Sequence, residues 1–307
     1  MCCIAPDDLY LSLKTQMTTF SENLFTEKFD FVELEQTVAS TVRLATQNSV
    51  SLYLFFQRYT YFNGYASSVI ARLASSIAMS RYLFNDSNEL EIEQADKGFQ
   101  ISAEIMVAAS DEGAYGITHR ELAQLLLKTS ADYAELSTEQ RNEFFKTPAY
   151  LDDISNAVMR GYQGTPGDAV SLIKAIGFHA ASEMLGDREY ALIDKIVRYE
   201  QKGSGFDTYL RNSSPVPIRG HKYDPWCYIV IHGKHEGSGA EARHFDHVLD
   251  ALNMVISYRP ESKRQIMEWV FQGYQSFVEL QQRLFKDIYR ECLESSQKSQ
   301  SEFAAMA

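Results

Sequence analysis

The sequence predicts an all-α protein, and three observations support this class. Residues 16–84 contain no proline, and their apolar positions recur at helical spacing rather than in the alternation of a strand. Three of the seven prolines lie within residues 202–225, so helix-breaking residues are concentrated in one segment. A further apolar stripe of helical period lies near the C-terminus and comprises Ile266, Val270, Phe277, Leu284 and Ile288.

The first half of the chain is expected to contain several helices in succession. Residues 16–84 have room for two or three of them. Another helix is expected over residues 90–110, because its apolar residues follow one another every three or four positions. The same stripe continues to Glu112, which directs a carboxylate toward the buried side of that helix.

Turn-forming residues divide the rest of the chain. Thr118 and Glu121 have the spacing of a capping box, which predicts a helix from there to about Thr129. Residues 202–225 are loop-rich and could serve as a lid or a connector. Three long helices are expected over residues 169–199, 226–258 and 261–294.

Composition favours one helical domain over residues 1–307, with a core from about 16 to 294 and a frayed C-terminal tail at 295–307. The net charge of -12 argues against nucleic acid as a partner, because binding to phosphates needs clustered Lys and Arg. Apolar runs such as Tyr53–Phe56 are far shorter than the ~20 residues of a membrane span. We therefore expect a cytoplasmic protein with a small-molecule substrate and no membrane contact, and a homodimer remains open.

The four cysteines match neither a zinc-binding spacing nor a disulfide framework. Cys2 and Cys3 are adjacent, and Cys227 and Cys292 are far from them and from each other. We interpret all four as reduced thiols, as is usual in the cytosol. The N-terminus also lacks the basic and apolar regions of a secretory signal.

Histidines are clustered in this chain, and all seven lie at or after position 119. Four of them, His232, His235, His244 and His247, fall within sixteen residues. Such a cluster alone is more often a surface feature than a metal site. Facing helices that carry His and Glu are nevertheless the usual means by which a helical bundle holds two metal ions.

Carboxylates in apolar stripes strengthen the metal hypothesis. Glu112 and His119 are seven residues apart, which is two helical turns if the segment stays helical. Glu183 follows His179 by four residues on an inward-facing stripe, and a buried carboxylate must be protonated, paired or bound to a metal. Two alternatives remain open: Glu112 at an exposed helix end, and Glu183 paired with His179 or an arginine.

These elements resemble the heme-oxygenase-like diiron oxidases and oxygenases, in which three core helices supply Glu and His, then Glu, then His-x3-Asp/Glu-x2-His. Glu112 with His119 resembles the first element, at the spacing seen in the subgroup related to the chlamydial death-domain-associating protein. Glu183 is similar in position to the second element, and the segment around His232 resembles the start of the third. The likeness covers roughly residues 50–290.

The third element departs from the family pattern. Its last histidine would fall on Gly239, whereas His244 comes five residues later. Glu241 and His244 have the correct mutual spacing, but the first histidine would then fall on Gly237. On a straight helix His232 and His244 would lie ~18 Å apart, too far to share one dimetal centre. Either the glycines loop out or one histidine is not a ligand.

The resemblance implies a heme-oxygenase-like multi-helix bundle and a non-heme diiron site that uses O2 to oxidise an amino acid, an amine or a fatty acid. It implies two iron ions, with manganese or a mixed pair as alternatives. His179 and Tyr190 would orient the ligands, although each is equally well explained as a core residue. The expected metal ligands are Glu112, His119, Glu183, His232, Glu236 and His244, with Glu241 as the alternative to Glu236.

Other functions are weaker candidates. A heme oxygenase of this fold would need an axial histidine near the N-terminus, and none precedes His119. A thiaminase-type hydrolase would need a nucleophilic cysteine, and Cys227 has no evident supporting base. The main alternative from another class is a non-enzymatic helical interaction protein whose His and Glu residues are structural.

Overall fold

The computed structural model describes residues 19–84, 90–113 and 117–306. The chain separates into two compact units, Met1–Asp30 and Phe31–Ala307. In the smaller unit, α2 (Glu22–Lys28) begins where the Ser21 hydroxyl accepts a hydrogen bond from the backbone N–H of Leu24. All candidate site residues belong to the larger unit, and Cys2 and Cys3 lie outside the described residues.

The all-α prediction is confirmed for the described residues, which are mostly helical. The β-structure among them is one short antiparallel hairpin, β1 (Val216–Ile218) and β2 (His221–Tyr223), in which Ile218 is paired with His221. The helices of the larger unit are α3 (Val32–Ala45), α4 (Ser49–Asn63), α5 (Ala66–Met79), η1 (Arg81–Phe84), α6 (Glu91–Asp111), α7 (His119–Tyr133), α8 (Thr138–Phe144), α9 (Ala149–Gly161), α10 (Ala169–Asp194), η3 (Lys195–Glu200), α11 (Gly205–Asn212), α12 (Cys227–His232), α13 (Ala240–Tyr258) and α14 (Lys263–Met306).

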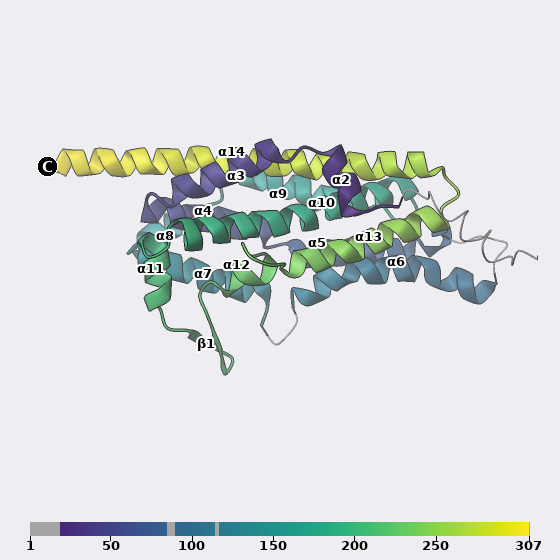
Figure 1. The fold of residues 1–307 in the computed structure, drawn as a ribbon, viewed down its shortest axis with the longest axis horizontal. Helices are drawn as coiled ribbons and strands as arrows, with labels where there is room; N and C mark the ends of the chain where they lie inside the picture. The colour runs from purple at the N-terminus through teal and green to yellow at the C-terminus, as the bar shows by residue number, and fades with distance from the viewer. Residues whose placement is uncertain (1–18, 85–89, 114–116, 307) are drawn as a thin grey trace, which may run out of the picture. The chain divides into compact units, whose positions relative to one another are not determined.

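Helix α10 is the central element of the larger unit. It packs against α14, α13, α12 and α3, and the long helices run side by side (Figure 1). A Cβ on Gly177 would overlap the carbonyl of Val270, so the backbones of α10 and α14 touch where they cross. Residues on every side of α10 are buried, because helices cover it all round. Side chains of α10 can therefore reach an interior site.

Two of the predicted helix boundaries are wrong. The helix expected over residues 226–258 is broken into α12 and α13, because three glycines between residues 233 and 239 disfavour a continuous helix. The helix expected to end at 294 continues as α14 to Met306, since residues 295–306 contain neither proline nor glycine. Among the described helices, none combines the length and apolar character of a membrane span.

The predicted helix over residues 169–199 is confirmed, and its last turns form the π-helical segment η3. The loop-rich segment that follows contains α11 and the β1–β2 hairpin. Asp207 on α11 has no exposed side-chain surface and binds Arg198 of η3 at 2.8 Å and Arg211 at 2.7 Å. The pair with Arg198 joins α11 to η3, and the pair with Arg211 lies within α11.

Candidate metal centre

The first part of the site lies where α6 ends and α7 begins. The capping box is confirmed, with the Thr118 hydroxyl accepting from the backbone N–H of Glu121 and the Glu121 carboxylate accepting from that of Thr118. Helix α6 ends at Asp111, so the expected two-turn relationship of Glu112 and His119 along a continuous helix is wrong. Instead the backbone N–H of His119 donates to the carbonyl oxygen of Glu112 at 3.0 Å, and this turn brings the two residues together.

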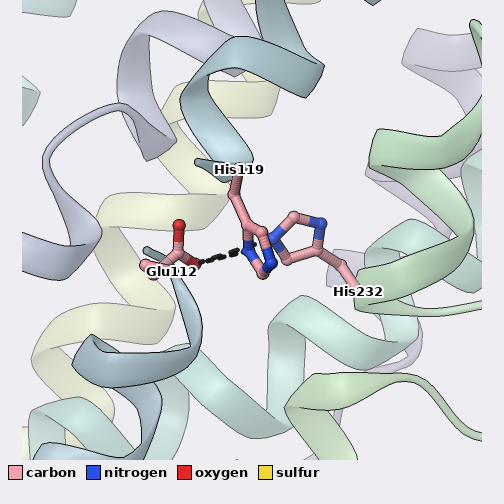
Figure 2. A group of neighbouring side chains, drawn as sticks. All are labelled: Glu112, His119 and His232. Carbon is pink, nitrogen blue, oxygen red and sulfur yellow. Dashed lines mark ion pairs between the residues drawn. The ribbon is translucent and has the colours of Figure 1, made fainter. Parts of the chain in front are cut away.

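Glu112, His119 and His232 form the tightest group of possible metal ligands in the described residues. Figure 2 shows their side chains converging from three segments of the chain. Glu112 Oε1 lies 3.2 Å from His119 Nδ1 and 3.6 Å from His232 Nε2. One ligand atom from each residue lies within 4.8 Å of the others. This spacing would allow all three to bind one ion.

A second group lies around Glu183 on α10. Its Oε1 is 3.2 Å from Nδ1 of His179, and its Oε2 is 3.2 Å from Nδ1 of His244 on α13. The Glu183 and His244 side chains are 6% and 3% exposed, and the His179 side chain is fully buried. His179 therefore contacts the Glu183 carboxylate, a contact expected both from a supporting role for His179 and from the alternative in which Glu183 is simply paired with it.

The break between α12 and α13 brings Glu241 and His244 of the third predicted element close to His232 and Glu183. A Cβ on Gly239 would overlap the carbonyl oxygen of His232, so the chain doubles back tightly on the end of α12. Helix α13 then starts at Ala240 and turns Glu241 and His244 inward. Glu241 Oε1 lies 3.7 Å from His232 Nε2.

One cavity of about 50 Å³ is lined by five of the candidate ligands: Glu112, Glu183, His232, Glu241 and His244. His119 is another expected ligand, and its ligand atom lies within 4.8 Å of those of Glu112 and His232.

Glu236 does not line the cavity. Its side chain is exposed, because α12 ends at His232 and the helical register that would place Glu236 one turn further is lost. Glu241, the alternative, takes the interior position. His235 is also exposed, and His247 pairs with Glu104 at 2.6 Å outside the cavity. The histidine cluster in the sequence thus divides into two interior and two peripheral residues.

One of the carboxylates around the cavity is not fully paired. Burial and the nearby carboxylates of Glu183 and Glu112 raise the pKa of Glu241 well above its usual range, and Glu241 Oε2 has no hydrogen-bond partner. Burial works to raise the pKa of Glu112 also, but the imidazoles of His119 and His232 outweigh it and lower that pKa. The described residues that line the cavity include no lysine or arginine.

Supporting contacts fix the orientation of both interior histidines. Nδ1 of His232 lies 2.6 Å from the carbonyl oxygen of Tyr228, which can only accept, so Nε2 is left facing the carboxylates. The ring of Tyr190 stacks on that imidazole at 4.5 Å. For His244, burial tends to lower the pKa, but the carboxylates of Glu183 and Asp111 outweigh it and raise the pKa.

Sequence reasoning missed several residues of the site. Asp111 Oδ2 lies 3.1 Å from Nε2 of His244 and also pairs with Arg243. Tyr228, Glu189 and Gln281 line the cavity, but no spacing in the sequence links them to the predicted ligands. The available signal for Asp111 was only its position beside Glu112.

Cys227 is a free thiol outside the cavity lining, and burial raises its pKa, which does not favour a nucleophilic role. The sequence matches no protein-family model, and none of the curated proteins with which it was compared is similar to it.

Proposed function

We propose that this chain is a metal-dependent oxidase or oxygenase that uses O2 and holds a non-heme diiron site in the cavity. One observation carries the proposal: three candidate ligand carboxylates, Glu112, Glu183 and Glu241, line one cavity with two imidazoles, and the described lining residues include no lysine or arginine. A buried carboxylate without a partner is strongly disfavoured, and divalent ions would relieve this. We infer that the helices around it form a heme-oxygenase-like bundle.

The donor set divides into two groups. Glu112, His119 and His232 would hold one ion, and Glu183 with His244 would hold the second. Glu241 lies against His232, and the nearby carboxylates of Glu183 and Glu112 help to raise its pKa, so its position would suit binding to either ion or both. The unpartnered Oε2 of Glu241 is the atom that most needs a cation.

The chemistry of the donors favours iron or manganese. Carboxylate oxygens with imidazole nitrogens suit these ions, and the described residues that line the cavity include no cysteine. When bound, a pair of ferrous ions would supply activation of dioxygen, which is the oxidant of the reaction. The protein orients the ligands through Asp111, Tyr228 and His179, and its buried cavity excludes bulk water.

Apolar residues in the cavity lining and the small volume limit the substrate. Ile70, Ala108 and Phe277 line the cavity, whose volume is about 50 Å³. We therefore expect a small metabolite with an apolar part, as a small amine or amino acid would be among the substrates implied by the family resemblance.

Ferrous reconstitution tests the proposal. Purified protein is loaded anaerobically, desalted and assayed for iron by mass spectrometry, alongside Glu183→Ala and the control Glu104→Ala, whose carboxylate contacts the peripheral His247. We expect about two irons per chain in the wild type and the control, loss of iron in Glu183→Ala, and oxygen consumption when the loaded protein meets air. No iron uptake by the wild type would favour the non-enzymatic interaction protein.

A further inference from the structure

The cavity has a second set of buried polar groups that the proposed metal ligands do not use. Glu189 on α10 and Gln281 on α14 both line it and are 4% and 2% exposed. Oε1 of each side chain has no hydrogen-bond partner. A buried acceptor without a donor is energetically disfavoured, so two of them beside one cavity indicate a missing donor.

The partners of Glu189 identify the kind of donor. Only its other oxygen is engaged, by a weak hydrogen bond of 3.4 Å from the Tyr59 hydroxyl. Burial raises the pKa of Glu189 well above its usual range, because desolvation disfavours an unpaired carboxylate. A cation beside Glu189 would offset the loss of hydration and favour the carboxylate.

The rest of the cavity wall offers no cationic side chain to an anionic head group. The described lining residues include no lysine or arginine, and in the metal-free cavity a carboxylate or phosphate would meet Glu189 and the three ligand carboxylates. The amide of Asn63 also lines the cavity, and its Nδ2 has no hydrogen-bond partner.

We propose that Glu189 and Gln281 bind the ammonium group of a small aliphatic amine, and that this is the substrate class of the site. The inference rests on the proposed function and narrows it from three substrate classes to one. The N–H groups donate to Glu189 Oε1 and Gln281 Oε1, and the alkyl part lies against Phe277 and Ile70. A free fatty acid has no group that these acceptors recognise.

Binding of matched four-carbon probes tests the inference without turnover. Butylammonium, butanol and butyrate are titrated into metal-free and iron-loaded protein, with binding followed by calorimetry and ligand-observed NMR. We expect butylammonium to bind at least tenfold more tightly than butanol, and butyrate not to bind. Equal or tighter binding of butyrate overturns the inference, and this wild-type comparison depends on no variant.

Substitutions then assign the binding groups. Glu189→Gln is isosteric and should weaken butylammonium at least tenfold, and Gln281→Leu should weaken it less. Glu268→Gln, on the exposed face of α14, should have no effect. Unchanged affinity in Glu189→Gln overturns the inference.

Iron content separates this inference from the proposed function. Glu189→Gln should keep the iron content of the wild type, because Glu189 is assigned to the substrate. Loss of iron in this variant would make Glu189 a metal ligand and overturn the inference. Iron uptake without amine binding refutes only the amine assignment, whereas amine binding to a protein that takes up no iron refutes the diiron site instead.

Discussion

The α-carbon of Gly239 lies against the carbonyl oxygen of His232, so closely that any side chain at position 239 would overlap it. This contact folds the chain back between α12 and α13 and lets His232 and His244 line the same cavity. Gly239→Ala should therefore destabilise the protein by about 1–3 kcal/mol, because the backbone must move apart. We also expect lower iron content, measured after ferrous reconstitution.

Gly113→Ala is the matched control for this substitution. Gly113 directly follows Glu112, but a Cβ there would meet nothing within 4 Å. Denaturant unfolding and iron content should both match the wild type. If Gly239→Ala behaves like Gly113→Ala, the close approach of residues 232 and 239 does not assemble the site.

Asp111 should act through His244 rather than as an independent ligand. Its carboxylate accepts from Nε2 of His244, which leaves Nδ1 facing Glu183. Asp111→Asn should weaken metal binding by about 10–100-fold, the usual effect of removing a carboxylate that orients a histidine ligand. Competition with a metal-binding dye measures this affinity. Glu104→Gln, which alters the peripheral pair with His247, should leave it unchanged.

Glu241 and Glu236 give a direct comparison of the two candidate carboxylates in the third element. Glu241→Gln should lower the iron content, because the buried Glu241 faces His232 across the cavity. Glu236→Gln should keep the full iron content, because the Glu236 side chain is exposed. The reverse result would mean that the segment between α12 and α13 rearranges when metal binds.

The ion pairs of Asp207 should make a pH-dependent contribution to stability that is independent of the metal site. Burial works to raise its pKa, but Arg211, the N–H of Gly203 and Arg198 outweigh burial and lower the pKa. The carboxylate therefore stabilises the fold above its unfolded pKa of about 3.9, and this contribution is lost as pH falls through the folded pKa.

Asp207→Asn should lower the free energy of unfolding by about 1.5–3 kcal/mol at pH 7, and the difference from the wild type should shrink below about pH 4. Urea unfolding at several pH values measures it. A difference that stays constant down to pH 2 would contradict this assignment.

The sequence predicted the helices, the capping box at Thr118 and most of the interior His and Glu residues, because each depends on local spacing. It did not predict how Glu112 and His119 meet, since a turn after α6 and not helical periodicity brings them together. The sequence also could not decide whether Glu236 or Glu241 is the interior carboxylate. This choice depends on where α12 ends, and a helix end near glycines is set by tertiary packing around Gly239.

The sequence also could not predict that Glu189 and Gln281 line the same cavity. They lie on different helices, almost a hundred residues apart, and become neighbours of one cavity only through the packing of α10 against α14. Asp111 is similar, because its contact with His244 joins the end of α6 to α13. Pairings of this kind depend on the packing of helices that are far apart in the sequence.

Anomalous X-ray scattering from crystals of the ferrous-loaded protein, recorded on both sides of the iron absorption edge, tests the dimetal site most directly. The account predicts two iron peaks within the cavity, one beside Glu112, His119 and His232 and the other beside Glu183 and His244. Absence of iron from the cavity, or iron only at exposed histidines such as His221 and His235, would contradict it.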